Sequence, residues 1–141
     1  MKTKLKVRDL MTEQVRSLST EDTALVAWDL MDDKHIRHVP VVDGDGEVVG
    51  LLSERDILRN ALAGASDLPV SAQRDYLRGI RIEEIMTSVP YTVEPEGELA
   101  EAGRMMLEFK ISCLPVVEGS TLVGIITESD FVRHLVEASE G

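Results

Sequence analysis

The sequence predicts an α/β protein made of two copies of one structural unit, and three observations support this prediction. Three blocks of residues occur twice, in one order and at a nearly constant spacing. Within each copy, short β-branched apolar runs alternate with stretches of helical periodicity. Each copy has about 70 residues, which is marginal for a separate hydrophobic core. We therefore expect one domain whose two halves share a core.

The duplication is visible in three pairs of blocks that share their pattern of apolar, acidic and hydroxyl residues. They are VRDLMT at 7–12 with IEEIMT at 82–87, IRHVPVVD at 36–43 with ISCLPVVE at 111–118, and GLLSERD at 50–56 with GIITESD at 124–130. The offset is 75 residues in the first two pairs and 74 in the third. Two copies favour a pseudo-two-fold pair, because open repeat stacks usually need three or more units.

Each copy is predicted to open with a short strand, at 15–18 and at 91–93, which a helix follows. Glu21-Asp22-Thr23 supplies acids and a hydroxyl at a helix start, where unpaired backbone N–H groups need acceptors. Residues at helical spacing then form the core face of this helix: Ala24, Ala27, Trp28 and Met31 in the first copy, and Leu99, Ala102, Gly103 and Met106 in the second.

Two strands and a second helix complete each copy. The strands are predicted at 39–42 and 48–52 and again at 114–117 and 122–126, and the helices at 54–62 and 128–136. The turn between the strands, rich in glycine and acidic residues, is one residue shorter in the second copy, which explains the change of offset. We place the first copy at residues 1–65, a linker with a short helix from Gln73 to Arg78 at 66–81, and the second copy at 82–141.

Composition excludes several classes of function. The net charge of −11 argues against a nucleic-acid or anionic-membrane partner. No apolar run approaches the roughly 18 residues of a membrane span, and the basic N-terminus lacks the apolar segment of a signal peptide. The single cysteine suits a reducing compartment, so we expect a cytoplasmic protein. The three histidines lack metal-site spacing, and no nucleophile has a partnering base, so we expect neither a metal nor an enzyme.

One motif could carry chemistry: a hydroxyl followed three residues later by aspartate, after a glycine-led strand. It occurs as Ser53 with Asp56 and as Thr127 with Asp130. It can be a capping box, in which the hydroxyl and the acid satisfy backbone N–H groups at a helix start. The same helix start also suits a phosphate, and the acid can accept hydrogen bonds from ribose hydroxyls. The motif therefore fits either a purely local cap or a nucleotide site.

Together, the three repeated blocks resemble the CBS domain, and two in tandem resemble the Bateman module. The resemblance implies a β-α-β-β-α fold in each repeat and a pseudo-two-fold packing of the two sheets. It also implies clefts between the repeats that bind AMP, ADP, ATP or S-adenosylmethionine, a homodimer, and signalling to a separate effector protein. We expect a regulatory module of this kind. The alternative is a structural or protein-interaction module with unoccupied clefts.

The resemblance also assigns roles to residues. Asp56 and Asp130 would hold ribose hydroxyls, and Ser53 and Thr127 would face phosphate. Phosphate contacts would also come from Arg37 and His38, whereas the second copy has the uncharged Ser112 and Cys113 at these positions. Residues after each Met-Thr would contact the base through their backbone. The remaining predicted ligand-binding residues are Val15, Ile36, Ser112 and Val89.

Several neighbouring residues have simpler explanations. Arg59 and Arg133 each follow a motif aspartate by three residues, which favours an ordinary helical ion pair. Cys113 is expected to pack as a small apolar residue. Trp28 matches Gly103 in the repeat, and this difference in bulk fits either core packing or a contact between subunits.

Overall fold

The computed structural model describes residues 4–65 and 67–141, which form two compact units. We name Arg16–Pro90 the first-repeat unit, and residues up to Val15 together with Tyr91–Gly141 the second-repeat unit. Each unit is a mixture of helices and strands around its own cluster of buried apolar residues. The predicted α/β class is therefore confirmed.

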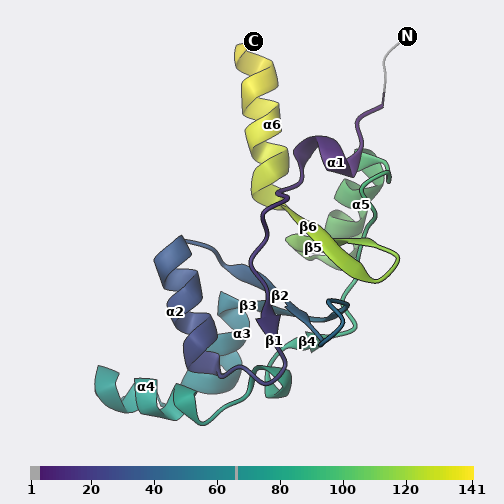
Figure 1. The fold of residues 1–141 in the computed structure, drawn as a ribbon. Coiled ribbons are helices and arrows are strands. Elements are labelled where there is room, and N and C mark those ends of the chain that lie inside the picture. The colour runs from purple at the N-terminus through teal and green to yellow at the C-terminus, as the bar shows by residue number, and fades with distance from the viewer. Residues whose placement is uncertain (1–3, 66) are drawn as a thin grey trace. The chain divides into compact units, whose positions relative to one another are not determined.

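The first-repeat unit contains a four-stranded sheet of order β1-β2-β3-β4 (Figure 1). β1 is parallel to β2, and the other neighbours are antiparallel. Its elements are β1 (Leu18–Ser19), α2 (Ala24–Lys34), β2 (His38–Val42), β3 (Val48–Ser53), α3 (Glu54–Ile57), the π-helical η1 (Leu58–Leu62), α4 (Val70–Arg78), the 3₁₀ turn η2 (Ile82–Glu84) and β4 (Thr87–Ser88).

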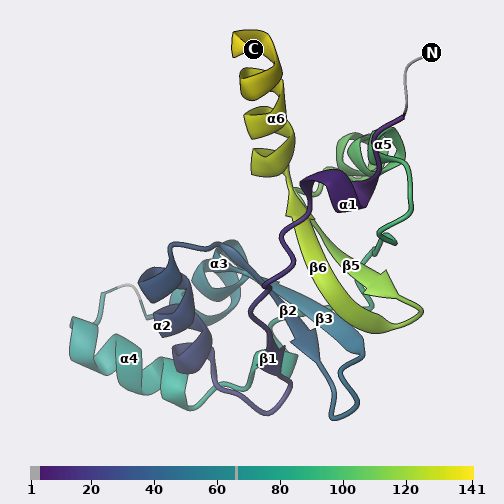
Figure 2. The same cartoon turned by 45° about the horizontal axis from the view of Figure 1, so that its top comes forward.

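The second-repeat unit contains the antiparallel hairpin of β5 and β6, which leads directly into α6 (Figure 2). Its elements are α1 (Val7–Leu10), α5 (Leu99–Phe109), β5 (Cys113–Glu118), β6 (Thr121–Thr127) and α6 (Glu128–Glu140). The helix–strand–strand–helix order after each opening segment matches the prediction for both copies.

The predicted opening strands at 15–18 and 91–93 are wrong in extent. In the first copy only Leu18 and Ser19 pair with β2. In the second copy the pairing is a single parallel bridge between Val93 and Val116. Pro95, two residues later, has no N–H with which to extend this ladder.

Each repeat donates its opening segment to the unit of the other repeat. Val7 is fully buried in the core of the second-repeat unit, and Ile82 is fully buried in the core of the first-repeat unit. The backbone bonds correspond at an offset of 75 residues. Val7 N donates to Gly97 O at 2.9 Å, and Ile82 N donates to Asp22 O at 2.8 Å. The repeats in the sequence and the units in space therefore divide the chain differently.

The glycine that leads each motif strand makes room for the methionine of an opening segment. A Cβ on Gly50 would clash with Met86 Sδ, and one on Gly124 would lie 3.0 Å from Met11 Sδ. The methionine block of each copy therefore packs against the glycine block of the other copy. This contact explains why both blocks are repeated.

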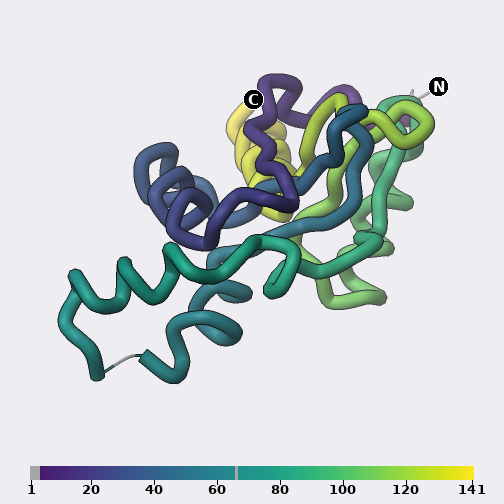
Figure 3. Tube along the Cα trace, turned by 60° about the horizontal axis from the view of Figure 1, so that its bottom comes forward, coloured from purple at the N-terminus to yellow at the C-terminus, as the bar shows by residue number. Residues whose placement is uncertain are grey.

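The linker forms a longer helix than predicted. α4 begins at Val70 rather than at Gln73 and packs against α2 and η1, as Figure 3 shows. Leu77 is buried in the core of the first-repeat unit, and Arg74 makes two hydrogen bonds with the Asp29 carboxylate of α2. Within the described ranges, no helix has the length and apolar character that crossing a bilayer requires.

Candidate functional site

The Ser53 and Asp56 motif forms a capping box at the junction of β3 and α3. Ser53 Oγ accepts a hydrogen bond from Asp56 N at 3.0 Å, and Asp56 Oδ2 accepts one from Ser53 N at 2.8 Å. Both residues are half-buried. The predicted local role of the motif is therefore confirmed. The Oδ1 atom of Asp56 has no hydrogen-bond donor among the residues that the structure describes.

The sheet register brings the predicted basic residues to this capping box. His38 lies opposite Ser53 in the β2–β3 pair, and Glu54 N donates to Arg37 O at 2.8 Å. Arg37 is exposed, and Ile36 packs against the core. We name Ile36, Arg37, His38, Ser53 and Asp56 the first-repeat cluster.

The second copy repeats this arrangement with different side chains. Asp130 Oδ2 accepts hydrogen bonds from Thr127 N at 2.8 Å and from the Thr127 hydroxyl at 3.3 Å. Cys113 lies opposite Thr127 in the β5–β6 pair, and Glu128 N donates to Ser112 O at 3.0 Å. We name Ser112, Cys113, Thr127 and Asp130 the second-repeat cluster.

The two aspartates differ in how much of the carboxylate is available. The Asp130 side chain is only 7% exposed, and its Oδ1 accepts a hydrogen bond from Arg133 at 3.0 Å. This is the predicted helical ion pair. No corresponding pair joins Arg59 to Asp56 among the described residues. Asp56 Oδ1 is therefore available to a ligand, whereas the corresponding atom, Asp130 Oδ1, already accepts a hydrogen bond from Arg133.

The Cys113 thiol is buried, as predicted for a small apolar residue. Burial, followed by the charge of Asp130, raises the pKa of the Cys113 thiol to about 12. The thiolate is the reactive form of cysteine, so the burial that raises this pKa also disfavours reactions of the Cys113 thiol.

Two predicted residues are not part of either cluster. Val89 N donates to Val49 O at 3.3 Å, so Val89 lies beside the opposite end of β3 from Ser53. It is 89% exposed and has a φ of 49°, which is uncommon for a β-branched residue. Val15 is half-buried and belongs to the second-repeat unit.

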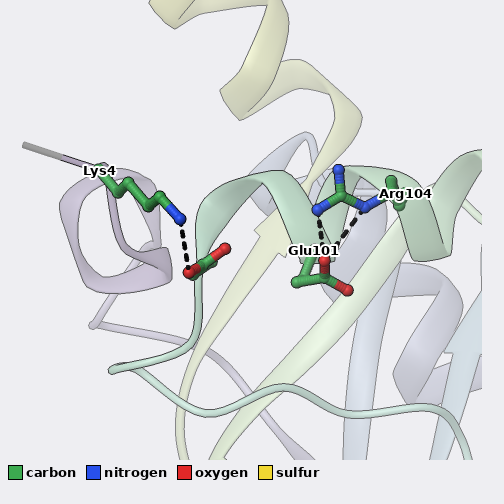
Figure 4. Close-up of polar contacts among 4 residues, drawn as sticks. Lys4, Glu101 and Arg104 are labelled. Atoms are coloured by element: carbon green, nitrogen blue, oxygen red, sulfur yellow. Dashed lines mark hydrogen bonds and ion pairs between the residues drawn. The ribbon is translucent and has the colours of Figure 1, made fainter. Parts of the chain in front are cut away.

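Sequence reasoning missed one hollow of about 380 Å³ in the second-repeat unit, between the opening segment and the start of α5. Glu98 and Glu101 line it, but Lys4 pairs with Glu98 and Arg104 with Glu101 (Figure 4). Both carboxylates therefore already form ion pairs with basic side chains of this chain. The alternation of glutamates at 94, 96 and 98 is the signal that could have indicated this acidic surface. No group of three possible metal ligands occurs within residues 4–65 and 67–141.

Trp28 packs against the core of the first-repeat unit, while at the matching position a Cβ on Gly103 would lie 3.3 Å from the Phe131 ring of α6. In the repeat, Phe131 corresponds to Ile57. In the first copy the larger side chain of the two is Trp28 on α2, and in the second copy it is Phe131 on α6. This exchange of bulk between neighbouring helices supports the core-packing explanation of Trp28.

The CBS domain family model matches residues 7–63 and 82–137. The chain belongs to the CBS domain family. The matches contain both capping boxes and both glycine-led strands, so the tandem pair inferred from the repeat is confirmed.

Solved structures show the same fold across nearly the whole CBS pair. A putative acetoin utilization protein from Vibrio cholerae is 36% identical, with a TM-score of 0.80, and the match covers 98% of this chain and 95% of that one. CBSX2 in complex with AMP is 28% identical, with a TM-score of 0.78 and coverage of 95% and 98%. The CBS domain pair of protein MJ0100, in complex with 5′-methylthioadenosine and S-adenosyl-L-methionine, is 26% identical, with a TM-score of 0.79 and coverage of 93% and 99%.

Curated relatives differ in length. The chain spans 33% of an uncharacterized Methanocaldococcus jannaschii protein, at 30% identity over 96% of this chain. It spans 95% of a CBS domain-containing protein of Dictyostelium discoideum, at 29% identity over 97% of this chain. A CBS pair of this kind thus occurs both within longer proteins and as most of a chain.

Proposed function

We propose that this CBS pair is a regulatory module that binds an adenine nucleotide, with the first-repeat cluster as its principal site. Two similar CBS pairs are named as complexes with adenosine compounds, AMP in one and 5′-methylthioadenosine with S-adenosyl-L-methionine in the other. Adenosine recognition is therefore compatible with this fold.

The observation that carries the proposal is the pairing of an available carboxylate with an exposed cation in the first-repeat cluster. Asp56 Oδ1 can accept hydrogen bonds from the ribose hydroxyls, as an acidic residue does in other nucleotide folds. Arg37 can form charge-assisted bonds to a phosphate, and Ser53 can add a hydroxyl. These groups match a nucleotide that carries at least one phosphate.

Regulation follows from differential affinity. A ligand shifts a protein toward the conformation that it binds better, by no more than the difference in its binding free energies. We propose that the chain forms a homodimer and passes this shift to a separate effector protein. We assign ligand binding to this module and no chemical reaction.

The test is to titrate the purified protein with AMP, ADP, ATP and S-adenosylmethionine and to measure binding by calorimetry. Thermal unfolding with and without each compound measures the stabilisation. A ligand at about 100 times its dissociation constant should add about 2.7 kcal/mol to the free energy of unfolding. Asp56→Asn and Arg37→Ala should weaken binding of the phosphate-bearing ligands. Lys34→Ala, which removes one positive charge from the same unit, is the matched control for Arg37→Ala.

The rival function is an interaction module without a small-molecule ligand. No stabilisation by any of the four compounds would support it and contradict the nucleotide proposal. So would binding that is indifferent to both Asp56→Asn and Arg37→Ala.

A further inference from the structure

One methionine side chain packs the second opening segment against β3. The Cγ, Sδ and Cε atoms of Met86 are the three atoms nearest to a Cβ placed on Gly50, and Sδ is the nearest of them. Gly50 is buried within β3. The thioether sulfur therefore lies directly on the strand backbone, at a position where only a glycine leaves room for it.

Met86 is more accessible than the methionines of the two cores. Met31 and Met106 are only 3% and 5% exposed, whereas Met86 is partly buried and packs against the buried cluster of its unit. Thr87, the next residue, is exposed. A small oxidant in solution can thus reach the Met86 side chain, while the core methionines are shielded from it.

β4, the strand that follows Met86, is short and lies at the edge of the sheet (Figure 1). Its two residues pair with β3, and one further bond joins Val89 N to Val49 O at 3.3 Å. Val89 has a φ of 49°, a strained conformation for a β-branched residue that is relieved when the segment leaves this position. Because the ladder is this short, the packing of Met86 contributes substantially to holding β4 on the sheet.

Met11, the matching residue of the first copy, makes a different contact. The atom nearest to a Cβ on Gly124 is Thr12 O, at 2.9 Å, and Met11 Sδ lies at 3.0 Å. The backbone thus shares this contact with the side chain. None of residues 12–15 has a positive φ, so no comparable strain follows Met11. Met11 is also partly buried, and it therefore provides an internal comparison for Met86.

We propose that Met86 is an oxidation site, at which a hydroperoxide converts the thioether to a sulfoxide and thereby releases β4 from β3. One oxygen atom passes from the peroxide to Sδ. The sulfur–oxygen bond forms and the oxygen–oxygen bond breaks, the sulfur loses two electrons to the peroxide, and water or an alcohol leaves. The product is methionine sulfoxide, which methionine sulfoxide reductases return to the thioether.

The release follows from the polarity of the sulfoxide. Its oxygen is a strong acceptor, and burying an acceptor without a donor is unfavourable. β3 has a partner strand on each side, so its backbone N–H groups are engaged in the ladders. The flexible side chain of oxidised Met86 therefore turns toward water and gives up its contact with Gly50. Ile82 and Ile85 stay buried, so the change is confined to β4 and Val89. Oxidation of Met86 does not depend on the nucleotide proposed above.

The test treats the wild-type protein with hydrogen peroxide, follows each methionine by mass spectrometry, and follows each amide by hydrogen exchange in NMR. Met86 should gain one oxygen faster than Met31 and Met106. The amides of β4 and Val89 should then exchange about tenfold faster, as expected for a local opening, while those of Ile82 and Ile85 keep their protection. Treatment with methionine sulfoxide reductases should restore the original exchange rates.

Two matched variants assign the effect to one sulfur. Met86→Leu keeps a similar volume but has no thioether, so peroxide should leave the exchange of its β4 amides unchanged. Met11→Leu makes the same change at the matching position and should respond to peroxide as the wild type does.

Three results would overturn the proposal. Met86 could oxidise no faster than Met31 and Met106, its oxidation could leave the β4 amides protected, or Met11→Leu could abolish the response. Equal loss of protection at Ile82 and Ile85 would show unfolding of the whole unit and would contradict a local release. If Met86→Leu does not fold, the wild-type protein still decides, because the loss of β4 protection must follow the fraction of Met86 that is oxidised.

Discussion

The opening segments of the two repeats are held by the same backbone bonds but by different side-chain interactions. Leu99 N donates to Leu5 O at 2.9 Å in the second-repeat unit, and Ala24 N donates to Ile80 O at 2.8 Å in the first-repeat unit. The isolated bridge of Lys6 with Glu98 corresponds to that of Thr23 with Arg81. The backbone pairing has thus been kept in both copies.

The side chains around this pairing have diverged. Lys6 and Arg8, at the start of the first opening segment, both pair with Glu96 in the turn before α5. In the first-repeat unit both Ile82 and Ile85 are buried, whereas the second-repeat unit buries Val7 and leaves Leu10 only partly buried; Arg81 pairs with Glu83 of its own segment. Exposed ion pairs contribute little stability, whereas buried apolar side chains contribute a great deal. The first-repeat unit should therefore hold its opening segment more tightly.

The largest expected effect comes from truncating the two buried anchors. Ile82→Ala should lower the free energy of unfolding by about 3 kcal/mol and Val7→Ala by about 2 kcal/mol, because each leaves a cavity in a core and isoleucine loses one more methylene. Denaturant unfolding measures both. A larger loss for Val7→Ala would reverse the order proposed for the two units.

The next largest effect concerns Gly50 and Gly124, the glycines that lie against the two opening segments. A Cβ on Gly124 would lie 2.9 Å from Thr12 O, a backbone atom that accepts a hydrogen bond from Ile125 N. On Gly50 the conflict is with the flexible Met86 side chain. Gly124→Ala should therefore cost about 2 kcal/mol and Gly50→Ala about 1 kcal/mol, within the range for overpacked cores. Equal losses in chemical denaturation would show that the Met86 side chain cannot move aside.

The features that could be predicted from sequence are those with local or repeated signals. The capping boxes depend on residues three apart, and the strands depend on short apolar runs, so both were found. The pair of Arg133 with Asp130 was also predicted, because its spacing is helical. The burial of Asp130 was not, since it depends on what packs around the helix start.

The exchange of opening segments could not be predicted for a similar reason. Val7 and Ile82 are apolar residues in a short helical turn, and nothing in their immediate sequence says which core they enter. The positive φ of Val89 also has no sequence signal, because β-branched residues are strongly disfavoured in that region. Non-local packing decides both features.

The Cys113 thiol provides a pH-dependent difference between the copies, because its counterpart is His38. The folded-state pKa is about 12 against an ordinary value of 9.0. Below pH 9 the thiol is protonated in both states and has no effect. As the pH rises above 9, the unfolded chain loses this proton first, so stability falls by about 1.4 kcal/mol per pH unit until the pH approaches the folded-state value.

The variant Cys113→Ala isolates this effect, since other alkaline titrations are common to both proteins. The wild-type protein should lose more stability than Cys113→Ala between pH 9 and 10.5 in denaturant unfolding. Parallel pH profiles would show that the buried thiol is not the group responsible.

The smallest expected effect concerns the ion pair of Lys6 with Glu96, in which the Lys6 side chain is 49% exposed and the Glu96 side chain 55% exposed. A double-mutant cycle of Lys6→Ala and Glu96→Ala should give a coupling of only about 0.5 kcal/mol, which decreases as salt rises because screening weakens exposed charges. The cost of Ile82→Ala should not change with salt. The salt dependence of these two measurements would then distinguish stabilisation of the opening segments by ion pairs from stabilisation by apolar burial. A coupling of several kcal/mol, or one that resists high salt, would mean that the second-repeat unit relies on this charged contact as much as the first-repeat unit relies on its buried isoleucines.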